Sequence, residues 1–284
     1  MLSTRTKVTI ARAAFSAINL ARRVVGASPE TVVTREGLRW RLDLREGIDL
    51  AIYLGVFERS TTRALRRLVR PGATVLDIGA NIGAHTLPLA KLVGPTGRVH
   101  SFEPTAFAHK KLLANLALNP ELAPRVSTHQ VMLTNGDAVA PELYSSWPLV
   151  RSDNLHARHQ GRLEPTTGAR ALRLDDYLAE IGVSHVDLVK LDVDGYECDV
   201  LAGASRFLAS AAPVIVMELA PYVLAERGHT LEELLGRLAG SGYRLEDETT
   251  GEPLPQDTAG ITGLIKDGGC MNVVGRPLAP KEKR

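Results

Sequence analysis

The chain has 284 residues, with 34 lysines and arginines against 32 aspartates and glutamates, so its formal net charge is +2. The charge is uneven: residues 1–29 carry five basic residues and no acidic one, whereas residues 30–280 carry 26 basic and 31 acidic residues. A nucleic-acid-binding domain gathers cations on its folded surface and uses aromatic rings for stacking, but this body is slightly acidic and only 5% of residues are aromatic. The composition therefore argues against a nucleic-acid partner.

The remaining totals are those of a globular protein. With 44% hydrophobic and 23% charged residues, the chain can bury a large core, and its length suits one large α/β domain or one domain with an appendage. Cys198 and Cys270 form no CxxC motif and no cluster with histidine in the sequence, which predicts neither a disulfide framework nor a zinc site and favours a reducing compartment. No apolar run approaches the roughly 20 residues that span a bilayer. We therefore expect a cytoplasmic protein without a transmembrane segment.

Residues 5–25 predict one basic, amphipathic helix, which Gly26 and Pro29 end. Apolar side chains recur in it at spacings of three and four, at Val8, Ala11, Phe15 and Ile18. Several interpretations stay open, because basic amphipathic helices are common: the helix binds a membrane surface or a partner, packs on its own domain, or pairs with the same helix in a homodimer.

Beyond this helix, residues 31–44 alternate in period two, which predicts a β-hairpin. From residue 58 onward, short apolar strands alternate with helices, as in a mostly parallel sheet that is covered by helices on both faces. We expect strands over residues 73–79, 97–103, 126–133, 186–192, 213–219 and 243–247. We expect helices over residues 58–69, after 81, and over 106–118, 197–209 and 230–239. We divide the chain into an appendage, residues 1–48, and a main domain, residues 49–284.

Four of the expected strands end in an acidic residue: Asp77, Glu103, Asp192 and Glu218. In open, mostly parallel sheets the ligand binds outside the carboxyl ends of the strands. This coincidence places a candidate site at that edge of the sheet.

The first of these strands runs into a glycine-containing loop with the pattern DxGxxxG, in which Gly79 and Gly83 let backbone and ligand approach closely. A nicotinamide dinucleotide site favours GxGxxG, and a carboxylate such as Asp77 would repel its pyrophosphate. The same carboxylate suits the cationic amino-acid end of S-adenosylmethionine, and Glu103, 20 residues after Gly83, suits its ribose hydroxyls. The pattern favours S-adenosylmethionine; the alternative is that the glycines only let a helix pack closely on the sheet.

The order and spacing of several strings resemble the FkbM family of methyltransferases over roughly residues 49–275: VLDIGANIGAHTLPLA, GRVHSFEP, LLANLALN, LRLDDYL, LVKLDVDGYECDVLAGA and VIVMEL. The resemblance implies a class I methyltransferase fold, Rossmann-like with a mostly parallel seven-stranded sheet, and S-adenosylmethionine as cofactor. It also implies O-methylation of a hydroxyl on a small molecule such as a natural product or a sugar. The family's cofactor motif falls on Asp77, Gly79, Asn81, Gly83 and Glu103, and its upstream acidic position on Glu58.

Two features depart from the family. Asp194 stands where the family usually has glutamate in DVEG, so a contact that needs the longer side chain is not carried over. Residues 134–170 show no regular pattern and align with no part of the family, and substrate-binding residues usually come from such a segment.

Methyl transfer to a hydroxyl requires a positioned acceptor and a group that removes its proton. Asp192 follows a strand beside the methionine end of the expected cofactor, so it is a candidate both for cofactor binding and for the base. Glu218 on the neighbouring strand is a second candidate base. The carboxylates of Asp192, Asp194 and Glu218 could instead hold Mg²⁺, an alternative that no histidine supports. Asp194 could also cap the helix that follows it.

Histidines add further candidates. His85 lies in the first turn after the glycine loop and is a candidate base, or else packs beside the methionine end of the cofactor. His156 and His159 would serve as bases if the irregular segment closes over the site. Lys190 shares a strand face with Asp192, and we expect a structural ion pair with Asp192 or Glu218.

Two other functions stay open at this stage. One is a nicotinamide-dependent oxidoreductase on a similar sheet, which the GxxxG spacing and Asp77 disfavour. The other is a non-catalytic binding subunit that contacts its partner through residues 5–25. The sequence identifies neither the methyl acceptor nor the choice between oxygen and nitrogen as the methylated atom.

Overall fold

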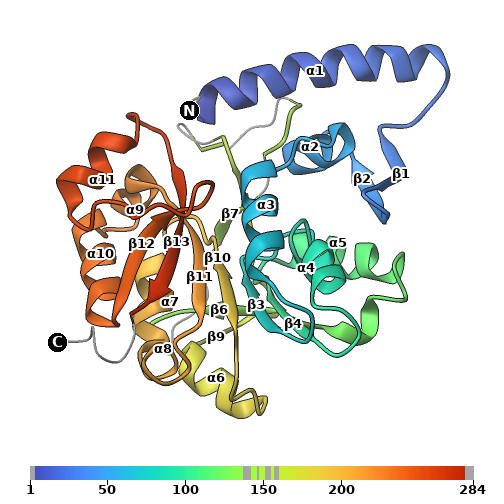
Figure 1. Ribbon diagram of the computed structural model, residues 1–284. Helices are drawn as coiled ribbons and strands as arrows, with labels where there is room; N and C mark the ends of the chain where they lie inside the picture. The colour runs from blue at the N-terminus through green and yellow to red at the C-terminus, as the bar shows by residue number, and fades with distance from the viewer. Residues whose placement is uncertain (1–3, 137–141, 146, 151–154, 157–159, 279–284) are drawn as a thin grey trace.

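The computed structural model describes residues 4–136, 142–145, 147–150, 155–156 and 160–278. At its centre lies a seven-stranded sheet in the order β12-β13-β11-β10-β3-β4-β5 (Figure 1). β13 runs antiparallel to both of its neighbours, and all other neighbours are parallel. The strands are β3 (Thr74–Ile78), β4 (Arg98–Phe102), β5 (Val126–His129), β10 (Leu188–Leu191), β11 (Val214–Leu219), β12 (Tyr243–Asp247) and β13 (Met271–Pro277). This is the expected mostly parallel, seven-stranded α/β fold.

Helices cover both faces of the sheet because successive strand residues point to opposite sides. On β3, Leu76 joins one hydrophobic cluster and Val75 joins the other. The first cluster is covered by α6 (Leu174–Glu180), α7 (Glu197–Gly203), α8 (Ser205–Ala211), α9 (Pro221–Glu226), α10 (Leu231–Gly240) and α11 (Thr258–Leu264). The second is covered by α3 (Arg59–Leu68), α4 (Thr86–Leu92) and α5 (Ala106–Ala117).

The N-terminal elements extend the second cluster. The predicted helix is α1 (Thr4–Val24), and the predicted hairpin is β1 (Glu30–Arg35) with β2 (Leu38–Asp43), followed by α2 (Gly47–Leu54). The hairpin is fastened to α5, because the side-chain oxygens of Asn115 and Asn119 accept hydrogen bonds from the backbone N–H groups of Arg41 and Arg39 at 2.8 and 2.9 Å. The boundary at residue 48 stays a prediction.

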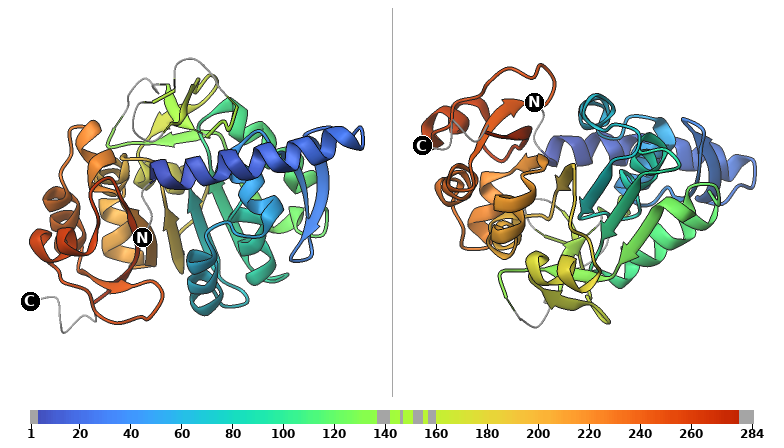
Figure 2. Two further views of the ribbon diagram at one scale, coloured as in Figure 1. Left: turned by 90° about the horizontal axis from the view of Figure 1, so that it is seen from above. Right: turned by 60° about the horizontal axis from the view of Figure 1, so that its bottom comes forward.

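Helix α1 crosses the molecule with its C-terminal end beside the hairpin (Figure 2). Phe15 is buried at 8% exposure and packs in the second cluster, and Arg12 donates a hydrogen bond to Gln160. The opposite side of the helix exposes Ile10 and Leu20. Within the described residues, no helix is both long and apolar enough to cross a membrane.

Several boundaries differ from the sequence-based expectation. The strand predicted over residues 126–133 is broken at Gln130 into β5 and β6 (Val131–Leu133), and β6 leaves the sheet to pair with β9 (Arg170–Leu172). The helix predicted over residues 197–209 bends at Ala204 into α7 and α8. The stretch predicted to be irregular contains a short antiparallel pair, β7 (Leu143–Ser145) with β8 (Arg162–Glu164). The two differences in the strands depend on a partner strand elsewhere in the chain, which local patterning does not reveal.

Candidate active site

The candidate site lies where three neighbouring strands end. Leu191 of β10 pairs with Ile78 of β3, which pairs with Phe102 of β4, so the three strands finish at one level. The next residues of these strands meet at a pocket with about 620 Å³ of empty space, part of it open to solvent. Its lining includes Gly79, Asn81, Glu103, Thr105, Met132, Tyr144, Asp192, Asp194, Tyr196 and Arg227.

The glycine loop needs its glycines for steric reasons. Gly79 has φ +80°, and a Cβ built on it would lie 1.7 Å from the backbone oxygen of Asp192. Gly83 has φ +87°, and its Cβ would lie 2.7 Å from a methyl group of Leu112 on α5. Asn81 also adopts a left-handed conformation, with φ +48°, which asparagine tolerates better than most residues. The turn can therefore press against β10 on one side and against α5 on the other.

Glu103 closes the loop from the end of β4. One carboxylate oxygen accepts a hydrogen bond from the backbone N–H of Asn81 at 3.0 Å, and the other accepts from the N–H and hydroxyl of Thr105 at 2.9 and 2.6 Å. Burial raises the pKa of Glu103 above its ordinary value, and these hydrogen bonds oppose the rise. The carboxylate is thus held rigidly at the pocket wall, where its remaining lone pairs can accept further hydrogen bonds.

Asp77 has a supporting position. It is fully buried, and it is not among the residues that line the pocket. One oxygen accepts a hydrogen bond from the Thr86 hydroxyl at 2.6 Å, and the other lies 4.0 Å from the Lys190 ammonium nitrogen without a hydrogen bond. Asp77 therefore ties β3 to the start of α4 and to the buried lysine.

Lys190 links the two strand-end loops. Its ammonium group donates to Asp192 Oδ2 at 3.1 Å and to the backbone oxygen of Gly79 at 3.4 Å. Burial by itself would lower the pKa of Lys190, but attraction to Asp192, Asp77 and Glu58 outweighs burial and raises it. The predicted ion pair is confirmed, with Asp192 as the partner rather than Glu218.

Acidic side chains gather around Asp192. Burial, then repulsion by Asp192 and Glu197, raises the pKa of Asp194 to about 8. Burial and then the charge of Asp192 raise the pKa of Glu218, which also has a hydrogen bond with Cys270 and is repelled by Glu58. Asp192 and Asp194 line the pocket, whereas Glu218 is not among its lining residues. The raised pKa values show that the pocket makes it costly for these carboxyl groups to be charged together. A positively charged ligand would lower that cost and favour their ionised forms.

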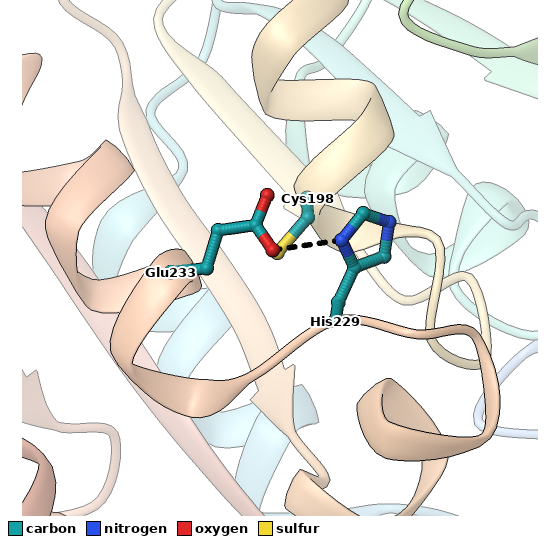
Figure 3. Close-up of side chains that lie close together, drawn as sticks. All are labelled: Cys198, His229 and Glu233. Atoms are coloured by element: carbon teal, nitrogen blue, oxygen red, sulfur yellow. Dashed lines mark hydrogen bonds and ion pairs between the residues drawn. The ribbon is translucent and has the colours of Figure 1, made fainter.

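The acidic cluster does not place its oxygens as one compact set of metal ligands. Among the described residues, one group of three potential ligand atoms lies within 4.8 Å of one another, and it consists of Cys198, His229 and Glu233 (Figure 3). This geometry adds no support for Mg²⁺ at Asp192, Asp194 and Glu218, which stays an alternative that removal of metal by a chelator tests.

His85 is placed behind the pocket rather than in it. Its ring is 3% exposed, its Nε2 lies 2.7 Å from Glu58 Oε2, and it lines a separate pocket between α3 and α4. Its Nδ1 is buried without a hydrogen-bond partner. Phe57 packs on the ring with 5.3 Å between centroids. This geometry suits a residue that positions Glu58, which has φ +29° and precedes α3.

Of the two histidines in the irregular segment, the structure describes one, His156. His156 Nε2 lies 3.4 Å from Glu226 Oε2, and the centroids of the His156 and Tyr144 rings are 4.8 Å apart. His159 lies outside the described residues.

Sequence reasoning missed several residues that line the pocket, among them Tyr144, Tyr196 and Arg227. Tyr144 lies on β7, Tyr196 directly precedes α7, and Arg227 directly follows α9. The guanidinium carbon of Arg227 lies 4.6 Å from the centre of the Tyr196 ring. Tyr196 lies within the DGYE string and could have been noticed there. Tyr144 and Arg227 carry no local signal, because only the folded chain brings them to the strand ends.

The strand order, with one antiparallel strand between β11 and β12, and a ligand pocket after a DxGxxxG turn, define a class I methyltransferase fold. The methyltransferase FkbM domain matches residues 77–245, which is more than half of the chain. The protein therefore belongs to the FkbM family of methyltransferases.

Three relatives are similar to the chain, and two of them are named as methyltransferases. The chain is 30% identical over 205 residues to the AMB antimetabolite synthetase AmbE of Pseudomonas aeruginosa, covering 59% of this chain and 9% of that protein. It is 28% identical to the 2-O-methyltransferase NoeI of Sinorhizobium fredii, and the match covers 50% of this chain and 61% of that protein. It is 31% identical to the 31-O-demethyl-FK506 methyltransferase FkbM of Streptomyces tacrolimicus, and the match covers 48% of this chain and 60% of that protein. The matches span less than two thirds of each of these relatives.

A solved structure, the methyltransferase FkbM from Methylobacillus flagellatus, superposes with a TM-score of 0.44 and 15% identity, covering 75% of this chain and 50% of that one. The family assignment itself favours a methyltransferase over the nicotinamide-dependent oxidoreductase.

Proposed function

We propose that the protein is an S-adenosylmethionine-dependent methyltransferase that methylates a hydroxyl of a small molecule. The observation that carries the proposal is the pocket at the ends of β3, β4 and β10, where Gly79 is pressed against Asp192 and the fixed carboxylate of Glu103 forms part of the wall. Only glycine permits that approach of the two loops.

The residues present fit this cofactor. Glu103 offers carboxylate lone pairs to ribose hydroxyls, and the turn from Gly79 to Asn81 lines the same pocket without a side chain at its first position. Asp192 supplies negative charge for an ammonium or a sulfonium, and such a cation would favour ionisation of Asp194 beside it. The same carboxylates would repel the diphosphate of a dinucleotide. When bound, S-adenosylmethionine supplies a methyl group already activated by its sulfonium. Gly83, Asp77 and Glu58 would support the site from behind.

Within this proposal Asp192 is our first candidate for the base. Its side chain is 29% exposed and lines the pocket, while Lys190 holds one of its oxygens. Glu218 and His85 remain alternatives, and both lie away from the pocket lining. Correct orientation of the acceptor lowers the activation barrier by roughly 7–11 kcal/mol in favourable cases. A positioned base raises the reaction rate by about 10²–10⁴-fold. The chain's own task is to hold the hydroxyl beside the carboxylate and to remove its proton.

The acceptor that we propose is a small natural product or a sugar. The names of two relatives describe O-methyltransferases, and Tyr144, Tyr196 and Arg227 give the pocket aromatic faces and one cation. Rings of this kind suit a flat or sugar-like molecule. Neither Cys198 nor Cys270, both among the described residues, forms a disulfide, which supports placing the reaction in the reducing cytoplasm.

Calorimetry with S-adenosylmethionine and with its demethylated product tests the proposal. We expect both to bind wild-type protein. Glu103→Gln should weaken binding by about tenfold or more, because the new amide N–H₂ group would face hydrogen-bond donors that the carboxylate accepts from. Glu121→Gln, which changes an exposed acid, is the matched control. Absence of binding to the wild type would refute the proposal, and binding without turnover on any acceptor would favour the non-catalytic subunit.

A further inference from the structure

A second group of reactive side chains lies outside the pocket, where α7 meets α10. Cys198 on α7, His229 just before α10 and Glu233 on α10 place one ligand atom each within 4.8 Å of the others. In Figure 3 the thiol of Cys198 and the Glu233 carboxylate lie side by side and face the imidazole of His229. Cys198 is fully buried, and the other two are partly buried.

The surrounding contacts orient these atoms. His229 Nε2 lies 3.2 Å from Asp199 Oδ2, which leaves Nδ1 turned toward Glu233 Oε2 at 2.8 Å. Arg237 donates to the other oxygen, Glu233 Oε1, at 2.7 and 3.2 Å. A histidine that ligates a metal usually donates its second ring N–H to a carboxylate, and ligating carboxylates are themselves hydrogen-bonded. Asp199 and Arg237 already occupy these two supporting positions.

We propose that Cys198, His229 and Glu233 form a Zn²⁺ site that joins α7 to α10. Thiolate, imidazole and carboxylate are the three ligand types that zinc takes in proteins, and three protein ligands leave one position for water. Binding releases the thiol proton of Cys198 and the proton between His229 and Glu233 to solvent. The thiolate, Glu233 and Asp199 then supply three negative charges, which Zn²⁺ and Arg237 balance.

The place of the site gives it a structural role. Cys198 follows Glu197, whose carboxylate accepts hydrogen bonds from the backbone N–H groups of Val193 and Gly195 in the loop after Asp192. A metal at Cys198 would therefore fix the start of α7 and, through Glu197, the acidic loop of the candidate active site. This role is independent of which ligand that pocket takes.

The test is titration of the metal-free full-length protein with Zn²⁺ alone, followed by calorimetry and by the melting temperature. We expect one Zn²⁺ per chain and a higher melting temperature, both lost in Cys198→Ser. Cys270→Ser, which removes the other cysteine, is the matched control and should bind Zn²⁺ as the wild type does. Asp199→Asn should weaken binding by about 10–100-fold, the usual effect of removing an outer partner.

Co²⁺ provides a second readout that depends on the ligands themselves. We expect a cobalt–thiolate absorption band in the wild type and in Cys270→Ser, and none in Cys198→Ser. If Cys198→Ser does not fold, His229→Gln and Glu233→Gln should each lower affinity instead. No binding to the wild type, or binding that these variants leave unchanged, overturns the proposal.

Discussion

The backbone oxygen of Asp192 occupies the space that a side chain at Gly79 would need, with only 1.7 Å to the position of a Cβ. Two loops from distant parts of the chain are therefore locked together at the end of the sheet, and the hydrogen bond from Lys190 to the backbone oxygen of Gly79 adds to this contact. One loop carries the glycine turn and the other carries the acidic residues. The arrangement explains why cofactor loop and candidate base form one rigid unit.

The first prediction concerns this contact. Gly79→Ala should lower the free energy of unfolding by about 3 kcal/mol or more, because it adds both a strained positive φ and a clash with backbone. Urea unfolding measures the loss. Gly236→Ala is the control, since Gly236 lies exposed inside α10 with nothing near its Cβ position, and there alanine should stabilise by about 0.5–1 kcal/mol. Equal effects of the two substitutions would contradict the steric argument.

The buried ion pair leads to a second prediction. Lys190→Met should destabilise the protein by about 3–5 kcal/mol, because the carboxylate of Asp77 would stay fully buried without a compensating charge. Lys110→Met on the exposed side of α5 should change stability by less than about 0.5 kcal/mol. Chemical denaturation of both variants decides the point, and a stable Lys190→Met protein would show that Asp77 does not need the lysine.

Glu197 should make stability depend on pH. Burial raises its pKa from 4.5 to about 7, so between these values the folded protein holds a proton that the unfolded chain has lost. The contribution of Glu197 to the free energy of unfolding should therefore be highest below pH 4.5 and should be lost as the pH rises through about 7.

Glu197→Gln isolates this effect, because its amide oxygen can still accept from Val193 and Gly195 but does not titrate. Relative to the variant, the wild type should lose about 3 kcal/mol across this range. Urea unfolding at a series of pH values measures the difference, and parallel curves would be evidence against a buried, titrating Glu197.

Asp192→Asn separates catalysis from binding. If Asp192 is the base, kcat should fall by about 10²–10⁴-fold while calorimetric affinity for S-adenosylmethionine changes by less than about tenfold. Asp267→Asn, at an exposed position, should leave both unchanged. Normal turnover in Asp192→Asn would direct attention to Glu218 or His85. Loss of activity in chelator that Mg²⁺, but not Zn²⁺, restores would instead support the magnesium alternative.

The sequence left open a homodimer that forms through α1, and a measurement of molecular mass in solution tests it. Leu20 is 67% exposed on the side of α1 that faces away from the domain, so Leu20→Glu should convert a dimer to a monomer in light scattering. Leu264→Glu, a substitution of another exposed leucine, on α11, should leave the mass unchanged. A wild-type protein that is monomeric at every concentration would contradict this mode of association.

The sequence could predict those parts of the site that short segments encode. The DxGxxxG turn, Glu103 after the second strand of the sheet and the Lys190–Asp192 pair all depend on residues close together or on strand ends that a parallel sheet must align. It could not predict that Asp77 and His85 lie behind the pocket wall, because Asp77 lies within β3 and His85 at the start of α4, and packing sets how these elements face the pocket. Nor could it predict Tyr144 and Arg227 in the wall.

The cysteines show the same limit. Cys198 has no histidine or cysteine at metal-ligand spacing in the sequence, and the sequence therefore predicted no zinc site. Only the packing of α7 on α10 brings His229 and Glu233 to its thiol.

By itself, then, the sequence determined the α/β alternation, the family resemblance and the acidic strand ends, because hydrophobic period and turn chemistry are local properties. The tertiary structure alone decided where β13 inserts, which carboxylates face the pocket and which aromatic residues complete it. Those features arise from contacts between segments far apart in the chain, and their energies depend on burial, which no local pattern specifies.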